Sequence, residues 1–502
     1  MLMKFHQIRG VLSVLGGFLL MLTAGSFCGT IGNMAPYFAS YMKQNNSEIT
    51  NEDLGIVLAA GGMTQGFGSL LAGNVIIPWL GYRVSLVIGV ILYCLAPLLS
   101  YFTIAYSLPA FTFTYGVLSA VVFYLIVLPS QLIPVTWFPD RKGLVTGIIA
   151  AGFGFGAAVF SPLQTFIINP ENTPPVTLNG SNSSSRYFQD IDVLDRTPLC
   201  LLYLAGMYAI LLILGILLCT EYIEPKIESK ERKSVLLKTR IVESGRYVFQ
   251  VGLKTKEIYL LAFCRFALLT VGGGLLAHWK GLSLRLNSDD QIISIIGGVN
   301  GLVSCIGRIL AGILIDRFSF NRVMPVVGAL LTIVLAITVP VSWISFPGFV
   351  ALLWLAYFFA FMHFSTIPTQ VLKLYDGKYC SSVLGVIGLT ESLSYGTVLV
   401  LNKLVFNNTE SYLPYYISMA VISLLTVGST ALVKNVSIQA DNSSLSTGNT
   451  DNSSLSTGNT DNSFLSTGKI DNSSLDTGNT DTSSLSTGNT ENSSLSTGNA
   501  DN

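Results

Sequence analysis

Charged residues are scarce in this chain. Only 11% of its 502 residues are Asp, Glu, Lys or Arg, whereas 50% are hydrophobic and the mean hydropathy is +0.58. An ordinary soluble domain carries about 25% charged residues. The 28 basic and 28 acidic residues cancel to a net charge of zero. The composition therefore excludes a soluble cytosolic enzyme, and the lack of net positive charge excludes a nucleic-acid binder.

Cysteine and histidine are also rare, with seven and three residues. No two cysteines form a CxxC pair, and no histidine lies at metal-ligand spacing from a cysteine. We therefore expect no disulfide framework, no metal site and no cofactor, and we expect the cysteines to pack as small apolar residues. The sequence also lacks a Walker motif and a nucleophile elbow, so we expect no catalytic residue and no enzyme activity.

Long apolar segments dominate what is present. A segment of about 20 apolar residues is long enough to cross a bilayer, and this chain has about twelve of them. The first follows Lys4 and Arg9 like a signal peptide, but it is too long and lacks a clear cleavage site, so we interpret it as a retained helix. The predicted spans are 11–38, 54–79, 83–101, 108–135, 143–168, 198–220, 257–279, 291–314, 322–342, 346–369, 381–406 and 412–433.

The distribution of Lys and Arg predicts the orientation. Cytoplasmic loops carry an excess of these residues. With both termini inside, the inner loops collect most of them, and the outer side keeps only Lys43, Arg186, Arg196, Lys280, Arg285 and Lys403. Four glycosylation sequons agree with this topology, because all of them fall in predicted outer loops. They begin at Asn45, Asn179, Asn182 and Asn407.

Two segments differ in composition from the spans. Residues 221–256 carry many charges of both signs and predict a solvated cytosolic loop between spans six and seven. From about Ala440 a Ser- and Thr-rich decamer repeats with one apolar residue per repeat, which predicts disorder. We expect four parts: an N-terminal six-helix bundle at 1–220, the central loop at 221–256, a C-terminal six-helix bundle at 257–433 and a disordered tail at 434–502.

The two halves share a sequence pattern. Leu71-Ala72-Gly73 precedes Arg83 by the same spacing at which Leu310-Ala311-Gly312 precedes Arg322. The second copy continues to Asp316 and Arg317. This pattern resembles the signature loop of the major facilitator superfamily. The resemblance implies an all-α membrane protein of twelve transmembrane helices, with Asp316 and Arg317 in a conformational latch in which Asp316 pairs with a basic residue of the facing half. Ile77 replaces the acidic residue in the first copy, which weakens the prediction there.

A sharper resemblance lies between the fourth and fifth spans. Residues 137–143 read Trp-Phe-Pro-Asp-Arg-Lys-Gly, and Gly152, Gly154 and Gly156 follow. This run resembles the signature of the oxalate/formate antiporter family, which is related to the monocarboxylate transporters. Asp140 and Arg141 belong to this run and are assigned to the latch. The resemblance implies small-anion or monocarboxylate substrates.

Two ionisable residues inside predicted spans are candidates for substrate binding, because a charge at the bilayer centre costs about 2.5–3.5 kcal/mol. Arg308 resembles the arginine with which the family engages a substrate carboxylate; the alternative is a role limited to the latch with Asp316. Glu391 falls where bacterial oxalate/formate antiporters carry a lysine. A carboxylate there disfavours a dianion. Glu391 has three alternative roles: pairing with Arg308, binding a coupled proton, or a structural hydrogen bond.

Further candidates lie on neighbouring helices. Arg265 either extends to the inner surface or pairs with Glu391. His363 is a second candidate for proton coupling, the alternative being a hydrogen-bonded core residue. Trp354, Tyr357 and Tyr395 are candidates for an aromatic wall of the substrate site, the alternative being packing.

The sequence thus predicts a secondary transporter of small organic anions, foremost monocarboxylates, working by alternating access and with proton coupling as an option. The expected partners are a small-molecule substrate, protons and the lipid bilayer. We expect a monomer in the plasma membrane. Two alternatives stay open: a transporter of amino acids or other small metabolites, and a membrane receptor or scaffold without transport activity.

Overall fold

A computed structural model describes residues 2–45, 49, 54–177, 186–222, 243–286, 290–406 and 411–434. Within these ranges the chain is helical apart from one short hairpin, which confirms the predicted all-α class. The first half consists of α1 (Leu2–Gly29), α2 (Ile31–Asn45), α3 (Gly55–Leu71), the π-helical η1 (Ala72–Ile76), α4 (Ile77–Thr103), α5 (Leu108–Phe111), the π-helical η2 (Thr112–Leu118), α6 (Ser119–Val135), the 3-10 helix η3 (Pro139–Arg141), α7 (Lys142–Ile168), strands β1 (Val176–Thr177) and β2 (Arg186–Tyr187), and α8 (Ile191–Leu218).

The second half is described here together with the end of the central loop. It consists of the π-helical η5 (Val248–Gly252), α10 (Lys256–Leu286), α11 (Asp290–Arg317), α12 (Phe320–Ser342), α13 (Phe346–Ala360), α14 (His363–Leu374), α15 (Cys380–Gly388), α16 (Thr390–Leu401), the π-helical η6 (Asn402–Phe406) and α18 (Tyr412–Ala431).

The described residues contain eleven helical stretches that are long and apolar enough to cross a membrane. One of them, Gly55–Thr103, has 49 residues and holds two of the predicted spans. At 1.5 Å per residue it would measure about 74 Å, more than twice the thickness of a bilayer core. Gly81 interrupts it with φ +80°, a conformation that glycine adopts without strain. The eleven stretches therefore accommodate all twelve predicted spans.

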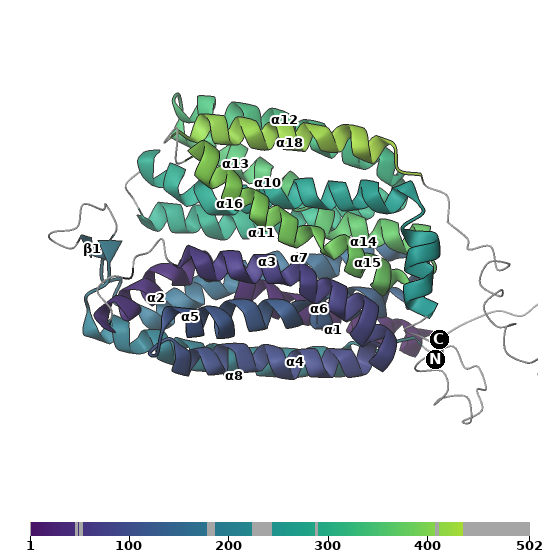
Figure 1. Cartoon of the computed structure of the whole chain (residues 1–502), viewed down its shortest axis with the longest axis horizontal. Coiled ribbons are helices and arrows are strands. Elements are labelled where there is room, and N and C mark those ends of the chain that lie inside the picture. Colours follow the sequence, from purple (N-terminus) through teal and green to yellow (C-terminus); the bar gives the residue numbers. More distant parts are fainter. Residues whose placement is uncertain are drawn as a thin grey trace, which may run out of the picture. The chain divides into compact units, whose positions relative to one another are not determined.

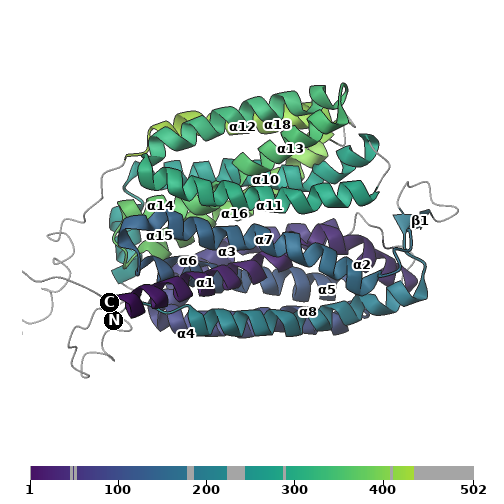
Figure 2. The ribbon, with the colours of Figure 1, turned by 180° about the vertical axis from the view of Figure 1, so that it is seen from behind.

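The helices of the two halves gather into two groups that face each other. Figures 1 and 2 show α1 to α8 together and α10 to α18 together, with α7 packed against α11 and α3 against α15 and α16 at the boundary. α1 begins and α18 ends at one end of this helical body, and the β1–β2 hairpin lies at the opposite end. We call these the Lys142 end and the hairpin end, because α7 begins with Lys142 at the first.

Two spans of the second half are broken in the middle. α13 ends at Ala360 and α14 begins at His363, while α15 ends at Gly388 and α16 begins at Thr390. At the first break, Phe361 leaves the helical conformation with φ −94° and ψ 3°. Broken helices near the middle of a transporter expose polar groups that can hold a substrate. Both breaks lie next to residues that the sequence singles out, His363 and Glu391.

The described end of the central loop, from residue 243, packs against the α14–α15 connection. Lys378 forms an ion pair with Glu243 at 3.1 Å, and the rings of Tyr247 and Tyr379 stack with centroids 4.1 Å apart. This part of the loop is therefore anchored to the second half. The remainder, residues 223–242, and the repeat tail lie outside the described residues.

The cysteines that the structure describes lie in helices or at their ends. Cys200, Cys219, Cys264, Cys305 and Cys380 are buried and Cys94 is half-buried. Cys380, which the sequence places in a polar loop, is the first residue of α15 and is fully buried.

Candidate functional site

A buried ion pair joins α10 to α16. The guanidinium of Arg265 contacts Oε1 of Glu391, and the phenol of Tyr124 on α6 donates a hydrogen bond to the same oxygen. Nη2 of Arg265 also donates to the Tyr124 hydroxyl at 2.8 Å. Arg265 therefore does not extend to the surface, and Glu391 pairs with Arg265 rather than with Arg308. Because α6 belongs to the first half, this triad connects the two halves.

Arg308 on α11 is equally buried but has no acidic partner. Its Nη1 donates to the carbonyl of Ala150 on α7 at 3.0 Å, and its Nε has no hydrogen-bond partner. Its guanidinium carbon lies 5.0–5.5 Å from three ring centroids, those of Phe153, Phe361 and Phe364. Cation–π contacts of this kind offset part of the cost of burying the charge. No carboxylate of the described residues pairs with it.

The two arginines share one aromatic ring. The guanidinium carbons of Arg265 and Arg308 lie 5.2 and 5.0 Å from the centroid of Phe364, so they are no more than about 10 Å apart. Glu391 is the one carboxylate paired in this cluster. With Glu391 ionised, the cluster carries a net charge of +1. An isolated positive charge buried between membrane helices is an attractive position for a monoanion.

A small cavity opens beside this cluster. Among its lining residues, Tyr124, Gln131 and Arg265 carry polar groups, and the rest are apolar or aromatic: Met21, Phe123, Val127, Leu128, Phe153, Phe364, Pro368, Leu384 and Ile387. Its volume of about 20 Å³ accommodates one water molecule. A molecule larger than water can therefore enter only after the helices around the cavity have moved apart.

The remaining predicted site residues do not line this cavity. His363 is fully buried, with Nδ1 2.8 Å from the carbonyl of Ala360 and Nε2 without a partner. Tyr357 is buried with its ring against Phe361, and neither its hydroxyl nor the indole N–H of Trp354 has a partner. Tyr395 packs against Gly62 of α3. Trp354, Tyr357 and Tyr395 are not among the residues that line the cavity with Arg265.

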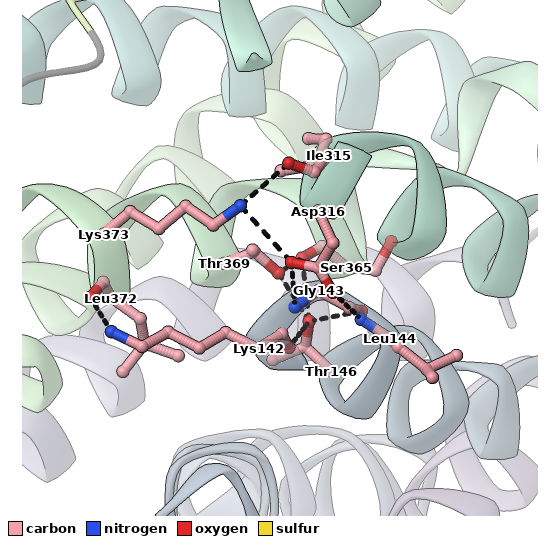
Figure 3. Close-up of polar contacts among 10 residues, drawn as sticks. All are labelled: Lys142, Gly143, Leu144, Thr146, Ile315, Asp316, Ser365, Thr369, Leu372 and Lys373. Atoms are coloured by element: carbon pink, nitrogen blue, oxygen red, sulfur yellow. Dashed lines mark hydrogen bonds and ion pairs between the residues drawn. The ribbon is translucent and has the colours of Figure 1, made fainter. Parts of the chain in front are cut away.

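Asp316 at the end of α11 bridges the two halves at the Lys142 end (Figure 3). Its carboxylate accepts the backbone N–H of Gly143 at 2.9 Å and that of Leu144 at 2.8 Å, both in the first turn of α7. A helix N-terminus carries a partial positive charge and unpaired N–H groups, so it binds a carboxylate well. The partner in the facing half is therefore a helix N-terminus, not a basic side chain.

Two lysines reinforce this contact. Lys373 on α14 forms an ion pair with Asp316 at 3.3 Å and donates to the carbonyl of Ile315 at 2.8 Å. Lys142 donates in the other direction, to the carbonyl of Leu372 at 2.9 Å (Figure 3). These bonds hold the ends of α7, α11 and α14 together. Asp140, Arg141 and Arg317 are exposed and take no part in this contact.

The repeated pattern of the first half forms a comparable but uncharged contact. Gly73 of η1 packs against Gly385 of α15, and Ser382 donates to the carbonyl of Gly73 at 2.9 Å. Asn74 donates back to the carbonyl of Ser382 at 3.3 Å. Ile77, in the position equivalent to Asp316, is buried. Neutral hydroxyl and amide groups thus replace the acidic residue on this side.

The predicted glycosylation sites are not described. Asn179, Asn182 and Asn407 lie outside the described residues, and Asn45 ends α2 without a described side chain.

Sequence reasoning missed several residues of the site. Tyr124 and Gln131 are seven residues apart on α6, which places two polar groups on one face of a helix whose only other polar residues are Ser119 and Ser130. That spacing could have identified them from the sequence. Lys373 was harder to recognise, as a cation in the last turn of a helix, and no sequence feature distinguishes Phe364.

Taken together, two facing groups of membrane-length helices enclose a buried cationic cluster, and this arrangement defines an integral, multi-pass membrane transporter rather than an enzyme. The sequence profile of the Major Facilitator Superfamily matches residues 14–398. The chain belongs to this superfamily.

Individual relatives agree with the assignment. Apicoplast pyruvate carrier 1 of Toxoplasma gondii is 25% identical over 401 residues, covering 66% of this chain and 72% of that carrier. Among solved structures, the transporter FucP in its outward conformation has a TM-score of 0.59 at 14% identity and covers 84% of this chain and 99% of FucP. A double-tryptophan variant of XylE has a TM-score of 0.63 at 14% identity and covers 87% and 97%. At these identities the two structures show the shared fold alone.

Proposed function

We propose that this chain is a secondary transporter of small organic anions, foremost monocarboxylates, that works by alternating access with proton coupling. The observation that carries the proposal is the charge of the buried cluster. Arg265 and Arg308 lie against the same ring of Phe364, and Glu391 balances one of them. The resulting charge of +1 matches one monoanion.

Charge matching also favours a monoanion over other substrates. When the substrate binds together with one proton on Glu391, a monoanion keeps the cluster at the charge of +1 that the empty carrier has, whereas a dianion such as oxalate lowers it to 0 and a neutral sugar raises it to +2. Each uncompensated charge in a membrane helix costs about 2.5–3.5 kcal/mol on insertion scales. A monocarboxylate with its proton therefore leaves the buried charge equal in the empty and the loaded carrier. The guanidinium of Arg308 stays charged at any physiological pH and suits a carboxylate.

Two likenesses support this substrate class. A relative that is 25% identical is named a pyruvate carrier. Residues 137–143 resemble the signature of the oxalate/formate antiporters, relatives of the monocarboxylate transporters. The apolar lining of the cavity suits the short hydrocarbon end of such an acid.

The latch supports alternating access. The contacts of Asp316 with Gly143 and Leu144 close the Lys142 end in this structure. We propose that these bonds form in one state of the cycle and break in the other, so that the cavity opens alternately to the two sides. Asp140, Arg141 and Arg317 lie at the same end but outside these contacts, so the proposed latch rests on Asp316.

Several finer assignments belong to the same proposal. Glu391 and His363 are the candidates for proton coupling, and Trp354, Tyr357 and Tyr395 are candidates that contact the substrate when the halves move. We propose a monomer in the plasma membrane that is glycosylated at Asn45, Asn179, Asn182 and Asn407.

Uptake into proteoliposomes tests the function. Purified protein is reconstituted and supplied with radiolabelled pyruvate, lactate, formate, oxalate or alanine, with protein-free liposomes as the control. We expect saturable uptake of the monocarboxylates, stimulated by an inward proton gradient, and little uptake of oxalate. Preferential uptake of alanine would favour an amino-acid carrier. Absence of any uptake, with intact protein, would favour a receptor or scaffold.

A further inference from the structure

The cation that faces the cavity is Arg265, not Arg308. The cavity lining includes Arg265 and Tyr124, whereas Arg308 lies behind Phe153 and Phe364 and donates to a backbone carbonyl. A carboxylate entering the cavity would therefore meet the guanidinium and the phenol first. Both donors already converge on one carboxylate oxygen, that of Glu391. The arrangement is a carboxylate site filled by a side chain of the protein itself.

Only one of the two carboxylate oxygens of Glu391 accepts hydrogen bonds from the described residues. Its Oε1 accepts from both Tyr124 and Arg265, while Oε2 is buried and has no partner. A buried carboxylate oxygen without a donor is costly. A proton placed on Oε2 removes the negative charge and weakens the hold of Arg265 on Oε1. The unpaired oxygen is thus the natural position for a transported proton.

We infer that Arg265 and Tyr124 form the site for the substrate carboxylate, and that Glu391 occupies this site in the empty carrier and leaves it on taking up a proton. The inference rests on the proposed function and extends it. Arg308, which lies against the same Phe364 ring, then provides the fixed positive charge that attracts the anion.

The charges of the cycle balance for one proton and one anion. The empty carrier with ionised Glu391 has a cluster charge of +1. Protonation raises the charge to +2, and binding of one monocarboxylate returns it to +1. The loaded and empty carriers therefore cross between states with the same buried charge. Binding of the anion without the proton would instead leave two carboxylates competing for Arg265.

The other ionisable groups around Glu391 are few. α6 contributes Tyr124, α10 contributes Arg265 with Cys264 beside it in sequence, and Tyr395 follows one turn later on α16 itself. α14 contributes His363, and α11 contributes Arg308 behind Phe364. α3, which also packs against α16, has no ionisable residue between Gly55 and Leu71. Glu391 is consequently the acid available for a proton at this point of the described structure.

The experiment compares concentrative uptake by wild type and E391Q in proteoliposomes. For coupling of one proton to one pyruvate, a pH gradient of one unit, acid outside, stores about 1.4 kcal/mol and concentrates pyruvate about tenfold inside. We expect this in the wild type, and no concentration by E391Q. A matched control is E257Q, which removes another buried glutamate, at the Lys142 end of α10. It should retain the tenfold gradient. Concentration by E391Q as strong as in the wild type would overturn the inference.

Two further variants test the inference even if E391Q fails to fold. The double variant R265Q/E391Q removes both charges and leaves no buried ion unpaired by the change, so we expect it to fold. It should lose nearly all pyruvate uptake while keeping a cooperative melting transition. Y124F should raise the pyruvate concentration for half-maximal uptake about tenfold, since it removes a hydrogen bond to a charged group. Y416F, which alters a buried phenol away from the cavity, serves as its control.

The two proposals fail differently. Wild-type protein that takes up no monocarboxylate contradicts the proposed function itself. Wild-type protein that takes up pyruvate, while folded R265Q/E391Q does so equally well, contradicts the Arg265 site alone and leaves Arg308 as the binding residue.

Discussion

The carboxylate of Asp316 accepts a hydrogen bond from the backbone N–H of Gly143 at 2.9 Å, and this bond connects the last turn of α11 to the first turn of α7. The two residues belong to different halves of the chain. Two further contacts join helices at the same place: Lys142 donates to the carbonyl of Leu372, and Lys373 forms an ion pair with Asp316. In the proposed cycle, this bond breaks when the Lys142 end opens.

Asp316→Asn should shift the carrier toward the state that is open at the Lys142 end. A charge at a partly buried helix N-terminus contributes up to about 2 kcal/mol, and loss of 1–2 kcal/mol changes the populations about fivefold to thirtyfold. The measurement is the labelling rate of a cysteine introduced at Thr369, which is buried between the halves in this structure. Asp140→Asn, at an exposed position of the same end, is the control and should leave the rate unchanged. Equal labelling in all backgrounds would remove Asp316 from the latch.

Gly312→Ala should open the same contact by steric means. A Cβ at Gly312 would collide with the carbonyl oxygen of Gly143, so α7 and α11 would have to separate. Overpacking of this kind costs about 1–3 kcal/mol. We expect a lower melting temperature and faster labelling at Thr369. Gly298→Ala on the same helix, where nothing lies within 4 Å of the new Cβ, should not lower the melting temperature. A Gly312→Ala variant with unchanged melting temperature and labelling rate would contradict the close packing of α7 against α11.

Gln131→Leu should change substrate preference. Gln131 is one of three residues with polar side-chain groups in the cavity lining. In the proposed pyruvate complex we expect it to donate a hydrogen bond to the oxo group next to the carboxylate. A hydrogen bond of this kind contributes about 0.5–1.5 kcal/mol. In an uptake assay in which pyruvate and propionate compete, the preference for pyruvate should fall about threefold to tenfold. Gln65→Leu, at a buried glutamine on α3 outside the cavity lining, should leave the preference unchanged. A preference that survives in Gln131→Leu would show that Gln131 does not contact the oxo group.

The helical architecture was predictable from the sequence, because a bilayer requires apolar residues along every span. Hydropathy located the spans even where the structure joins two of them into Gly55–Thr103. Local signals also placed some boundaries. Ser345 caps α13 by accepting the N–H of Gly348, and Pro347 stands in the first turn.

The pairing of charges was not predictable to the same degree. Arg265 and Glu391 are 126 residues apart, and hydropathy does not give the rotation of a helix about its axis. The sequence therefore left the pairing of Arg265 open. The acidic partner of the α7 N-terminus was recognisable as Asp316, but the backbone N–H groups that bind it have no sequence signature. Phe364, which lies against both arginines, resembles any other aromatic residue in an apolar span.

The most direct test of the account is pyruvate uptake by Arg308 variants. Two charges 10 Å apart interact by about 1.7 kcal/mol at an effective dielectric constant of 20, which corresponds to nearly twentyfold in binding. With reconstituted protein, Arg308→Gln should raise the pyruvate concentration for half-maximal uptake by at least that factor, and Arg308→Lys, which keeps the charge, should raise it far less. Folded Arg308→Gln protein with wild-type affinity for pyruvate would contradict the claim that an unbalanced buried charge selects the substrate.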